Sequence, residues 1–313
     1  MKRFKPFAVF AFVLLLGGLL VGCGNKEGSA PAEEGGKKKV TVSTSFLEDM
    51  VHELAGDLVD INVIIPRGED PHLYVAKPED LKKVQEADLV LYHGLHFEGK
   101  MGQILDKVGK PVTAEFTKED VGTMEEDDAV VEDPHFWFSI PLYKKATEEA
   151  AKNLEELLPE KKDVIEENLT RYLGELDALE QEAKASIDSI PKESRILITP
   201  HDAFNYFSRA FGVEVHAPQG VSTDSEVAGA DIDKTVDVIV SHKVKAIFAE
   251  STTDPARMEK LREACAKKGV DVTVVKGEGK ELLSDSLAPK GQDGDTYISM
   301  VRHNVKLMEE YMK

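Results

Sequence analysis

Three of the nine histidines in this chain directly follow a proline, and they are the first residues that suggest chemistry. They are His72, His135 and His201, and the first two share the tripeptide Asp-Pro-His. Proline has no backbone N–H and holds φ near one value, so each histidine should lie on a stiff loop. More than sixty residues separate each from the next, so they can meet only across a fold. The pattern favours a shared metal site over three unrelated loop histidines.

The remaining histidines are weaker candidates. His93 and His96 stand at an i, i+3 spacing after an apolar strand, which could bind metal, but we prefer a solvated turn at the surface of the lobe. The histidines that fall inside helix or strand patterns, and that we expect in the core or on the surface, are His52, His216, His242 and His303.

Residues beside the Pro-His motifs could shape such a site. Asp70 and Asp133 each stand two residues before a histidine, and each could accept the second imidazole N–H or only cap the turn. Trp137, two residues after His135, could shield the site from water or simply belong to the core.

The amino end predicts export and a lipid anchor. Three basic residues precede an uncharged apolar run from Phe7 to Val21, which is too short for a membrane span. The run leads into Leu20-Val21-Gly22-Cys23, which resembles a bacterial lipobox, whose cysteine is lipidated. We therefore expect a lipoprotein signal peptide at residues 1–23 and a protein held by Cys23 on the extracytoplasmic face of the cell membrane. A plain signal peptide that ends near Cys23 is the alternative.

Composition and charge narrow the class of protein further. Residues 24–38 are mostly Gly, Ser, Pro, Glu and Lys, so they predict a flexible tether. The net charge is −19, and loss of the three basic residues of the signal takes the mature chain to −22. Such a surface repels phosphates and argues against nucleic acid as a partner, although solubility explains most of this charge.

The chain has two cysteines. If Cys23 carries lipid, Cys265 has no partner, and no disulfide is expected in spite of the oxidising compartment. Cys265 lies in a helical pattern and is expected to be a buried small hydrophobe rather than a ligand.

Short apolar strands alternate with helices in both halves of the chain. In the first half the expected order is strand 40–43, helix 46–54, strand 60–65, helix 78–87, strand 88–92 and helix 101–108. In the second half it is strand 195–199, helix 203–211, strand 213–215, helix 232–241, strand 246–249, helix 257–268, strand 272–275 and helix 296–312. This alternation predicts an α/β fold with mostly parallel sheets, whose ligand sites lie beyond the carboxyl ends of the strands.

One long amphipathic helix is predicted between the halves, from Glu160 to Ile187, with Pro159 and Pro191 beside its ends. At 1.5 Å per residue it would be about 42 Å long, enough to pack along two lobes. A coiled-coil dimer is the alternative, but the apolar stripe is short and irregular. The expected division is therefore a first lobe at 39–159, a linking helix at 160–189 and a second lobe at 190–313.

An ordered set of motifs points to a family. After the lipobox come Gly68-Glu69-Asp70-Pro71-His72-Leu73-Tyr74, Glu132-Asp133-Pro134-His135-Phe136-Trp137, Thr199-Pro200-His201-Asp202-Ala203-Phe204, Gln219-Gly220-Val221-Ser222-Thr223, Glu250-Ser251-Thr252 and Ser284-Asp285-Ser286-Leu287. From about Val40 to the carboxyl end, the chain resembles the zinc/manganese solute-binding lipoproteins of bacterial ABC importers.

The resemblance implies two β/α lobes joined by one long helix, with a single metal ion in the cleft between them. It implies that His72 and His135 from the first lobe, and His201 and Asp285 from the second, are the ligands. It also implies an ABC permease and its ATPase as partners, and we expect the receptor itself to be a monomer.

The chain departs from the family at a few positions. Ala76 replaces a proline that is common after the first histidine motif, and Glu226-Val227-Ala228 stands where many members have Glu-Pro-Ser. The acidic loop from Phe116 to Glu132 lacks the histidine-rich insert of many zinc-specific members. Neither substitution touches the ligand set, but the missing insert leaves zinc and manganese both open as the transported ion.

Ligand chemistry agrees with this assignment. Three neutral imidazoles and one carboxylate make a closed four-coordinate shell suited to zinc, or a five-coordinate one if Asp285 binds through both oxygens. A secreted zinc hydrolase is the rival interpretation, but such enzymes keep an open position for water, and no His-Glu-x-x-His helix is present. We expect a receptor rather than an enzyme, and a role as an adhesin is a second possibility for an outer lipoprotein.

Overall fold

The computed structural model describes residues 36–126 and 129–313, and residues 37–313 form one unit through their internal contacts. The predicted signal peptide, Cys23 and nearly all of the predicted tether lie outside the described residues. Within the described part of the chain, no helix combines the length and the apolar composition that crossing a bilayer requires.

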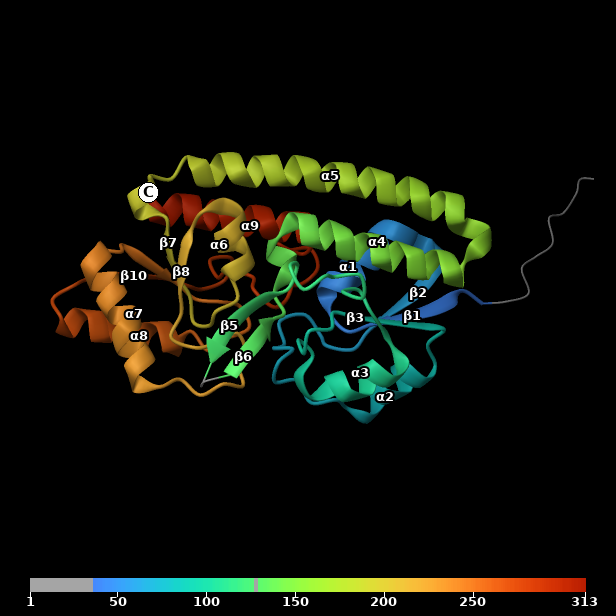
Figure 1. Ribbon diagram of the computed structural model, residues 1–313, viewed down its shortest axis with the longest axis horizontal. Helices are drawn as coiled ribbons and strands as arrows, with labels where there is room; N and C mark the ends of the chain where they lie inside the picture. The colour runs from blue at the N-terminus through green and yellow to red at the C-terminus, as the bar shows by residue number, and fades with distance from the viewer. Residues whose placement is uncertain (1–35, 127–128) are drawn as a thin grey trace, which may run out of the picture. The chain divides into compact units, whose positions relative to one another are not determined.

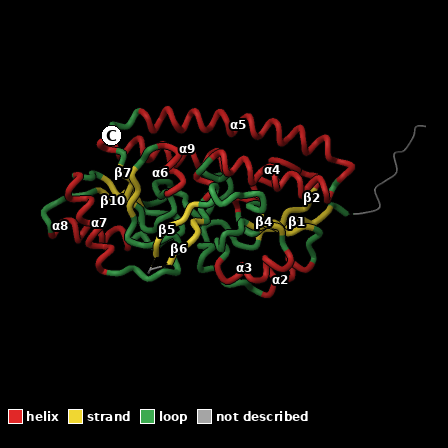
Figure 2. Tube along the Cα trace, viewed as in Figure 1, coloured by secondary structure: helices red, strands yellow, loops and turns green. Residues whose placement is uncertain are grey.

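The first lobe is built on a parallel sheet with the strand order β2-β1-β3-β4 (Figures 1 and 2). Its strands are β1 Lys38–Val42, β2 Val59–Val63, β3 Leu89–Tyr92 and β4 Lys110–Pro111. The helices that connect them are α1 Ser45–Ala55, α2 Pro78–Gln85 and α3 Gly102–Val108. In Figure 1, α1 lies on one face of the sheet, and α2 and α3 lie on the other. Strand β3 is buried along its whole length and is an apolar run because both faces of the sheet are covered there.

The second lobe repeats this style with shorter strands. Strand β7 Ile196–Ile198 pairs in parallel with β8 Glu214–His216, and β9 Ala246–Phe248 pairs in parallel with β10 Thr273–Val275. The helices of this lobe are α6 Asn205–Phe211, α7 Gly229–His242, α8 Ala256–Lys267 and α9 Tyr297–Met312. Cys265 on α8 is buried, as predicted.

Three features were not predicted, of which the shortest is strand β4 Lys110–Pro111. An antiparallel hairpin, β5 Gly122–Glu126 and β6 Ala129–Asp133, lies within the segment expected to be an acidic loop, and helix α4 Ile140–Leu157 follows it. The hairpin is rich in acidic residues, and Ala129 and Val130 are exposed, so it shows little of the apolar alternation that marks a half-buried strand. The other predicted elements are present, with ends that differ from prediction by at most three residues.

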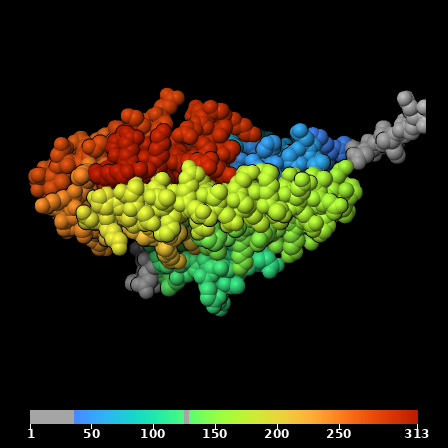
Figure 3. All heavy atoms as spheres, turned by 90° about the horizontal axis from the view of Figure 1, so that it is seen from above, coloured from blue at the N-terminus to red at the C-terminus, as the bar shows by residue number. Residues whose placement is uncertain are grey.

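The predicted long helix is α5 Lys162–Asp188, one continuous helix of 27 residues. It packs against α1 and α4 of the first lobe and against α9 of the second, as Figures 1 and 3 show. The long helix α5 therefore packs along both lobes, as predicted. One residue of the predicted apolar stripe, Val164, is instead 45% exposed, because it lies at the first turn of the helix, off the buried face.

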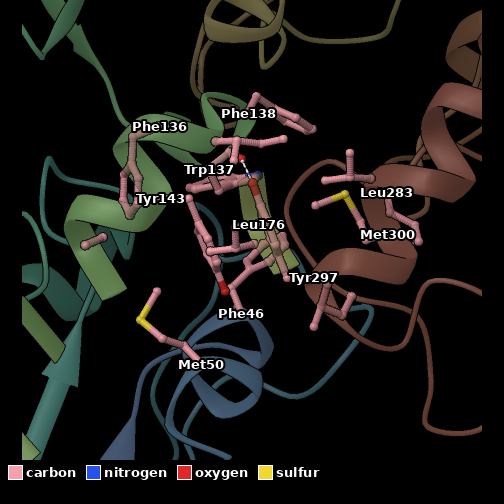
Figure 4. Packing of buried hydrophobic residues seen from close by; sticks show 14 of the residues in the cluster. Phe46, Met50, Phe136, Trp137, Phe138, Tyr143, Leu176, Leu283, Tyr297 and Met300 are labelled. Carbon is pink, nitrogen blue, oxygen red and sulfur yellow. Dashed lines mark hydrogen bonds between the residues drawn. The ribbon is translucent and has the colours of Figure 1, made fainter. Parts of the chain in front are cut away.

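A single apolar cluster crosses the junction of the lobes. It joins Phe46 of α1 and Trp137 of the first lobe to Tyr297 and Met300 of α9 (Figure 4). The Tyr297 hydroxyl donates a hydrogen bond to the Trp137 carbonyl oxygen at 2.7 Å, and Trp137 stacks on Phe46 with ring centroids 5.0 Å apart. The fold class predicted from the sequence, two β/α lobes joined by a long helix, is confirmed.

Candidate metal centre

His72 lies on the loop that follows β2 and is 4% exposed. Its backbone N–H donates to Asp70 Oδ1 at 2.9 Å, and its ring meets the edge of Phe97 with centroids 5.1 Å apart. Gly99, at φ +43°, lies so close that a Cβ there would overlap the His72 carbonyl oxygen. Asp70 therefore caps the turn and does not accept an imidazole proton, which was one of its two predicted roles.

His135 follows the hairpin and is fully buried. Asp133 Oδ1 lies 2.8 Å from His135 Nδ1 and also accepts its backbone N–H at 3.0 Å, so Asp133 fills both of its predicted roles. This contact directs Nε2 toward the other histidines, since the two ring nitrogens point in different directions. Trp137 is 5.2 Å from the His135 ring and is fully buried, so it both covers this histidine and belongs to the core.

His201 follows β7 by three residues, and its backbone bridges to Gln219. Its Nδ1 lies 2.5 Å from Oε2 of Glu250, a carboxylate that the sequence analysis did not single out for any role. Glu250 follows β9 by two residues and is fully buried. Two signals were available: Glu250 begins the motif Glu250-Ser251-Thr252, and it lies beyond the carboxyl end of a buried strand, the edge at which ligand sites of parallel sheets lie.

Asp285 lies on the segment between β10 and α9 and is fully buried. Its Oδ1 is 3.4 Å from His135 Nε2, and its Oδ2 is 3.3 Å from His201 Nε2. Thr252 donates its hydroxyl to Oδ2 at 3.3 Å. The carboxylate thus faces imidazoles from both lobes.

The four predicted side chains converge at the junction of the lobes. One ligand atom from each of His72, His135, His201 and Asp285 lies within 4.8 Å of all the others. Within the described part of the chain, the Nε2 atoms of the three histidines and Oδ1 of Asp285 are buried without a hydrogen-bond partner. Buried polar atoms are nearly always paired, so four orphaned donors and acceptors facing one point indicate a site for a ligand.

Burial and charge act differently on the three imidazoles. Burial lowers the pKa of His72 to about 3. For His201, burial also acts to lower the pKa, but the carboxylates of Glu250 and Asp285 outweigh it and raise the pKa well above its ordinary value. Burial acts to raise the pKa of Asp285, yet its attraction to His201 and His135 holds that pKa well below its ordinary value.

The same balance raises the pKa of His135. Burial opposes the charged form, while the nearby carboxylates of Asp133 and Asp285 favour it more strongly. The site therefore carries an ionised carboxylate between two imidazoles that bind protons well, beside a third that stays neutral.

The expectation of a solvated turn at His93 and His96 was wrong for His93. That ring is fully buried, its Nε2 lies 2.8 Å from Thr44 Oγ1, and burial lowers its pKa to about 3. His96 is exposed, as expected. The tight turn that contains both residues has φ above zero at Gly94, Leu95 and His96. The side chains of His93 and His96 therefore point in different directions although they are only three residues apart.

Comparison with known proteins identifies the family of this chain. The model of one family, described as the periplasmic zinc-uptake complex component A (ZnuA), matches residues 40–311. The chain belongs to this family. The manganese-binding lipoprotein MntA of Bacillus subtilis is 34% identical over 308 residues, covering 97% of this chain and 99% of MntA. The zinc-binding protein TroA of Treponema pallidum is 36% identical over 299 residues, covering 95% and 96%.

Solved structures of the same kind superpose over most of this ZnuA-family chain. One from work on the metal-binding specificity of TroA has 57% sequence identity and a TM-score of 0.88, covering 89% of this chain and all of that one. The periplasmic zinc-binding protein TroA from Treponema pallidum has 34% identity and a TM-score of 0.83, covering 88% and 99%.

Proposed function

We propose that this protein is an extracytoplasmic, lipid-anchored receptor that binds one divalent metal ion, zinc or manganese, and delivers it to an ABC importer. The convergence of four buried, unpartnered ligand atoms at the junction of the lobes carries this proposal. Leaving one buried polar group unpaired costs about 1–3 kcal/mol, so a bound cation would relieve a strain that the fold otherwise retains.

The donor set favours zinc over manganese. Three imidazole nitrogens and one carboxylate oxygen suit a four-coordinate zinc ion, and the Irving–Williams order places zinc above manganese at such a site. The two relatives described above are named for different metals, manganese for MntA and zinc for TroA. We infer that the site binds zinc more tightly in vitro and takes manganese where zinc is scarce.

Delivery of the ion requires partners and a place in the cell. The matched family is described as a component of an uptake complex, which supports an ABC permease and its ATPase as partners. We propose that lipid on Cys23 holds the receptor, as a monomer, at the outer face of the membrane. The proposed boundaries are 39–159 for the first lobe, 160–189 for the linking helix and 190–313 for the second lobe.

A hydrolase is the less favoured alternative because Asp285 lies where a catalytic zinc ion would need to hold water. No observation on the described residues favours an adhesin role.

Metal analysis and competition titration test the proposed function. Purified mature protein, freed of metal with a chelator, should bind one divalent ion per chain, and zinc should displace manganese. Manganese that displaces equimolar zinc would contradict the ligand argument, and a protein that binds neither ion would overturn the proposed function. A Cys23→Ala variant should bind metal normally but leave the membrane fraction, which tests the anchor separately.

A further inference from the structure

Asp285 lies on a segment whose contacts pass from the second lobe to the first. Leu282 and Leu283 bond within the second lobe through their backbone N–H groups. Leu282 N–H donates to the Ala249 carbonyl oxygen at 2.9 Å, and Leu283 N–H donates to Asn304 Oδ1 at 2.9 Å. The change begins at Ser284, whose carbonyl oxygen accepts Nε1–H of the first-lobe residue Trp137 at 2.8 Å. These bonds fix the chain as it approaches the metal centre.

After Asp285, the contacts are with the first lobe. Ser286 Oγ accepts the Gly68 N–H at 2.8 Å, and Leu287 N–H donates to Ser45 Oγ at 3.0 Å. The carboxylate of Asp285 is therefore attached to the second lobe on one side and to the first lobe on the other. Its distance from His72 and His135 depends on this second attachment.

Arg67 makes the most hydrogen bonds of the residues that attach this segment to the first lobe. Its Nη1 donates to the Ala288 carbonyl oxygen at 2.8 Å and to the Asp295 carbonyl oxygen at 2.7 Å. Its Nε and Nη2 both donate to Glu48 Oε2, at 3.1 and 2.8 Å. The Arg67 side chain is only 14% exposed, so solvent screens these bonds little. Arg67 also precedes His72 by five residues on the same loop.

We propose that Arg67 is a positioning residue for Asp285, tying the loop that carries His72 to the segment 284–288 so that the carboxylate faces the first-lobe histidines. The proposal rests on the proposed metal-binding function. A planar guanidinium can donate to two carbonyl oxygens and a carboxylate at once, because its five N–H groups form a rigid fork. A lysine in its place has one compact ammonium group and can restore only part of this arrangement.

Cobalt(II) is a suitable probe because its visible spectrum reports the geometry and number of its ligands. In purified mature protein, Arg67→Ala should weaken cobalt binding by about 10- to 100-fold, the usual effect of removing a group that supports a ligand. Its cobalt spectrum should shift toward that of Asp285→Ala. Arg67→Lys should recover part of both. Amide exchange of residues 284–296 in the metal-free protein should be faster in Arg67→Ala than in wild type.

Arg302→Ala is the matched control. Arg302 bonds to Glu182 across α9 and α5, is 54% exposed and contacts neither Asp285 nor its loop. It should leave cobalt affinity, spectrum and local exchange unchanged. If Arg67→Ala does not fold, Ser286→Ala removes the Gly68 acceptor from the same attachment and should give the same shift on a smaller scale.

Each outcome has a separate meaning. Wild-type affinity and spectrum in Arg67→Ala would overturn the positioning role, since the contacts that remain around Asp285 would then suffice to hold it. Weaker binding with an unchanged cobalt spectrum would also overturn it, because the loss would reflect stability and not ligand placement. A wild-type protein that fails to bind cobalt would instead contradict the proposed function, while the exchange measurement would still test the attachment.

Discussion

Two of the three clustered histidines are held through a carboxylate, and the third is held by packing. Asp133 contacts Nδ1 of His135, and Glu250 contacts Nδ1 of His201. Among residues 36–126 and 129–313, Nε2 of His72 is buried without a hydrogen-bond partner, and the ring meets the edge of Phe97.

The difference shows how one site can combine basic ligands with a neutral one. A carboxylate behind an imidazole fixes its tautomer and raises its basicity, which strengthens a metal bond but also strengthens proton binding. Packing alone fixes the ring without attracting a proton, and burial then keeps His72 neutral, with a pKa of about 3. His135 and His201 should therefore respond to pH, and His72 should not.

The largest expected effect comes from removing a ligand. If a total binding free energy of about 10–16 kcal/mol is shared among four ligands, alanine at His72, His135, His201 or Asp285 should each weaken zinc binding by roughly 100-fold or more. Competition with a chelator of known affinity measures this. His52→Ala, which changes an exposed histidine on α1, should bind zinc as wild type does.

Wild-type affinity in all four variants would contradict the site. A normal affinity in His72→Ala alone would show that the packed histidine is not a ligand. The comparison of His72 with His135 and His201 would then be between a residue beside the site and two ligands.

Removing the supporting carboxylates should have the next largest effect. Asp133→Asn and Glu250→Gln should each weaken zinc binding by about 10- to 100-fold, because an amide holds the imidazole less firmly and can favour the wrong tautomer. Asp70→Asn is the matched control, since its Oδ1 can still accept the His72 backbone N–H. Isothermal titration of the three variants gives the comparison, and equal losses in all three would remove the distinction between the histidines.

Protons should compete with metal at two of the three histidines. The pKa values of His135 and His201 are raised, so both hold protons up to a higher pH than free imidazole and must release them on binding. Affinity should therefore fall as pH falls from neutral, by up to about 1.4 kcal/mol per pH unit for each proton displaced. His72 adds no competition above about pH 4.

Calorimetry in buffers of different ionisation enthalpy counts the released protons. Below neutral pH we expect the count to approach about two, and Glu250→Gln should lower it. A count near three would mean that His72 is protonated in the metal-free protein. A count of zero would contradict the raised pKa values.

The sequence was sufficient to predict the alternation of strands and helices. Buried parallel strands are short apolar runs, and the helices carry clear stripes of apolar residues. The sequence was not sufficient for the β5–β6 hairpin, whose sequence is rich in acidic residues and lacks that pattern. The three Pro-His histidines were predicted from the proline that precedes each of them, and Asp285 from the family resemblance. Their convergence depends on contacts between distant segments, such as the bond from Trp137 Nε1 to the Ser284 carbonyl oxygen.

The supporting residues were harder to predict than the ligands. Asp70 and Asp133 occupy the same place in the same tripeptide, yet only Asp133 contacts an imidazole nitrogen. Thr223 Oγ1 donates to Asp70 Oδ2, so that carboxylate is engaged across the lobes instead. Glu250 has no local motif in common with His201 and reaches it only because β7 and β9 lie side by side. Such pairings are properties of the fold and not of local spacing.

The smallest expected effect is a change of shape. Metal binding should alter the radius of gyration, measured by small-angle scattering, by less than about 1 Å, since packed helices shift by only about 1–2 Å between states. The continuous helix α5 offers no hinge, and bonds such as Tyr297 N–H to Asp49 Oδ2 and Tyr206 Oη–H to the Asp133 carbonyl oxygen already join the lobes without metal.

Gly174 in α5 allows a sharper version of this experiment, because no other atom lies within 4 Å of a Cβ built there. Gly174→Ala should leave the small change in radius of gyration on metal binding as it is in wild type. Gly174→Pro should kink the helix and make that change larger. If the change in the wild-type protein is small, metal binding orders the loops that carry the ligands, while the lobes and helix α5 stay nearly fixed. A large compaction of the wild-type protein on binding zinc would instead show that the lobes close around the ion, and His72 would then owe its position to that closure rather than to packing against Phe97.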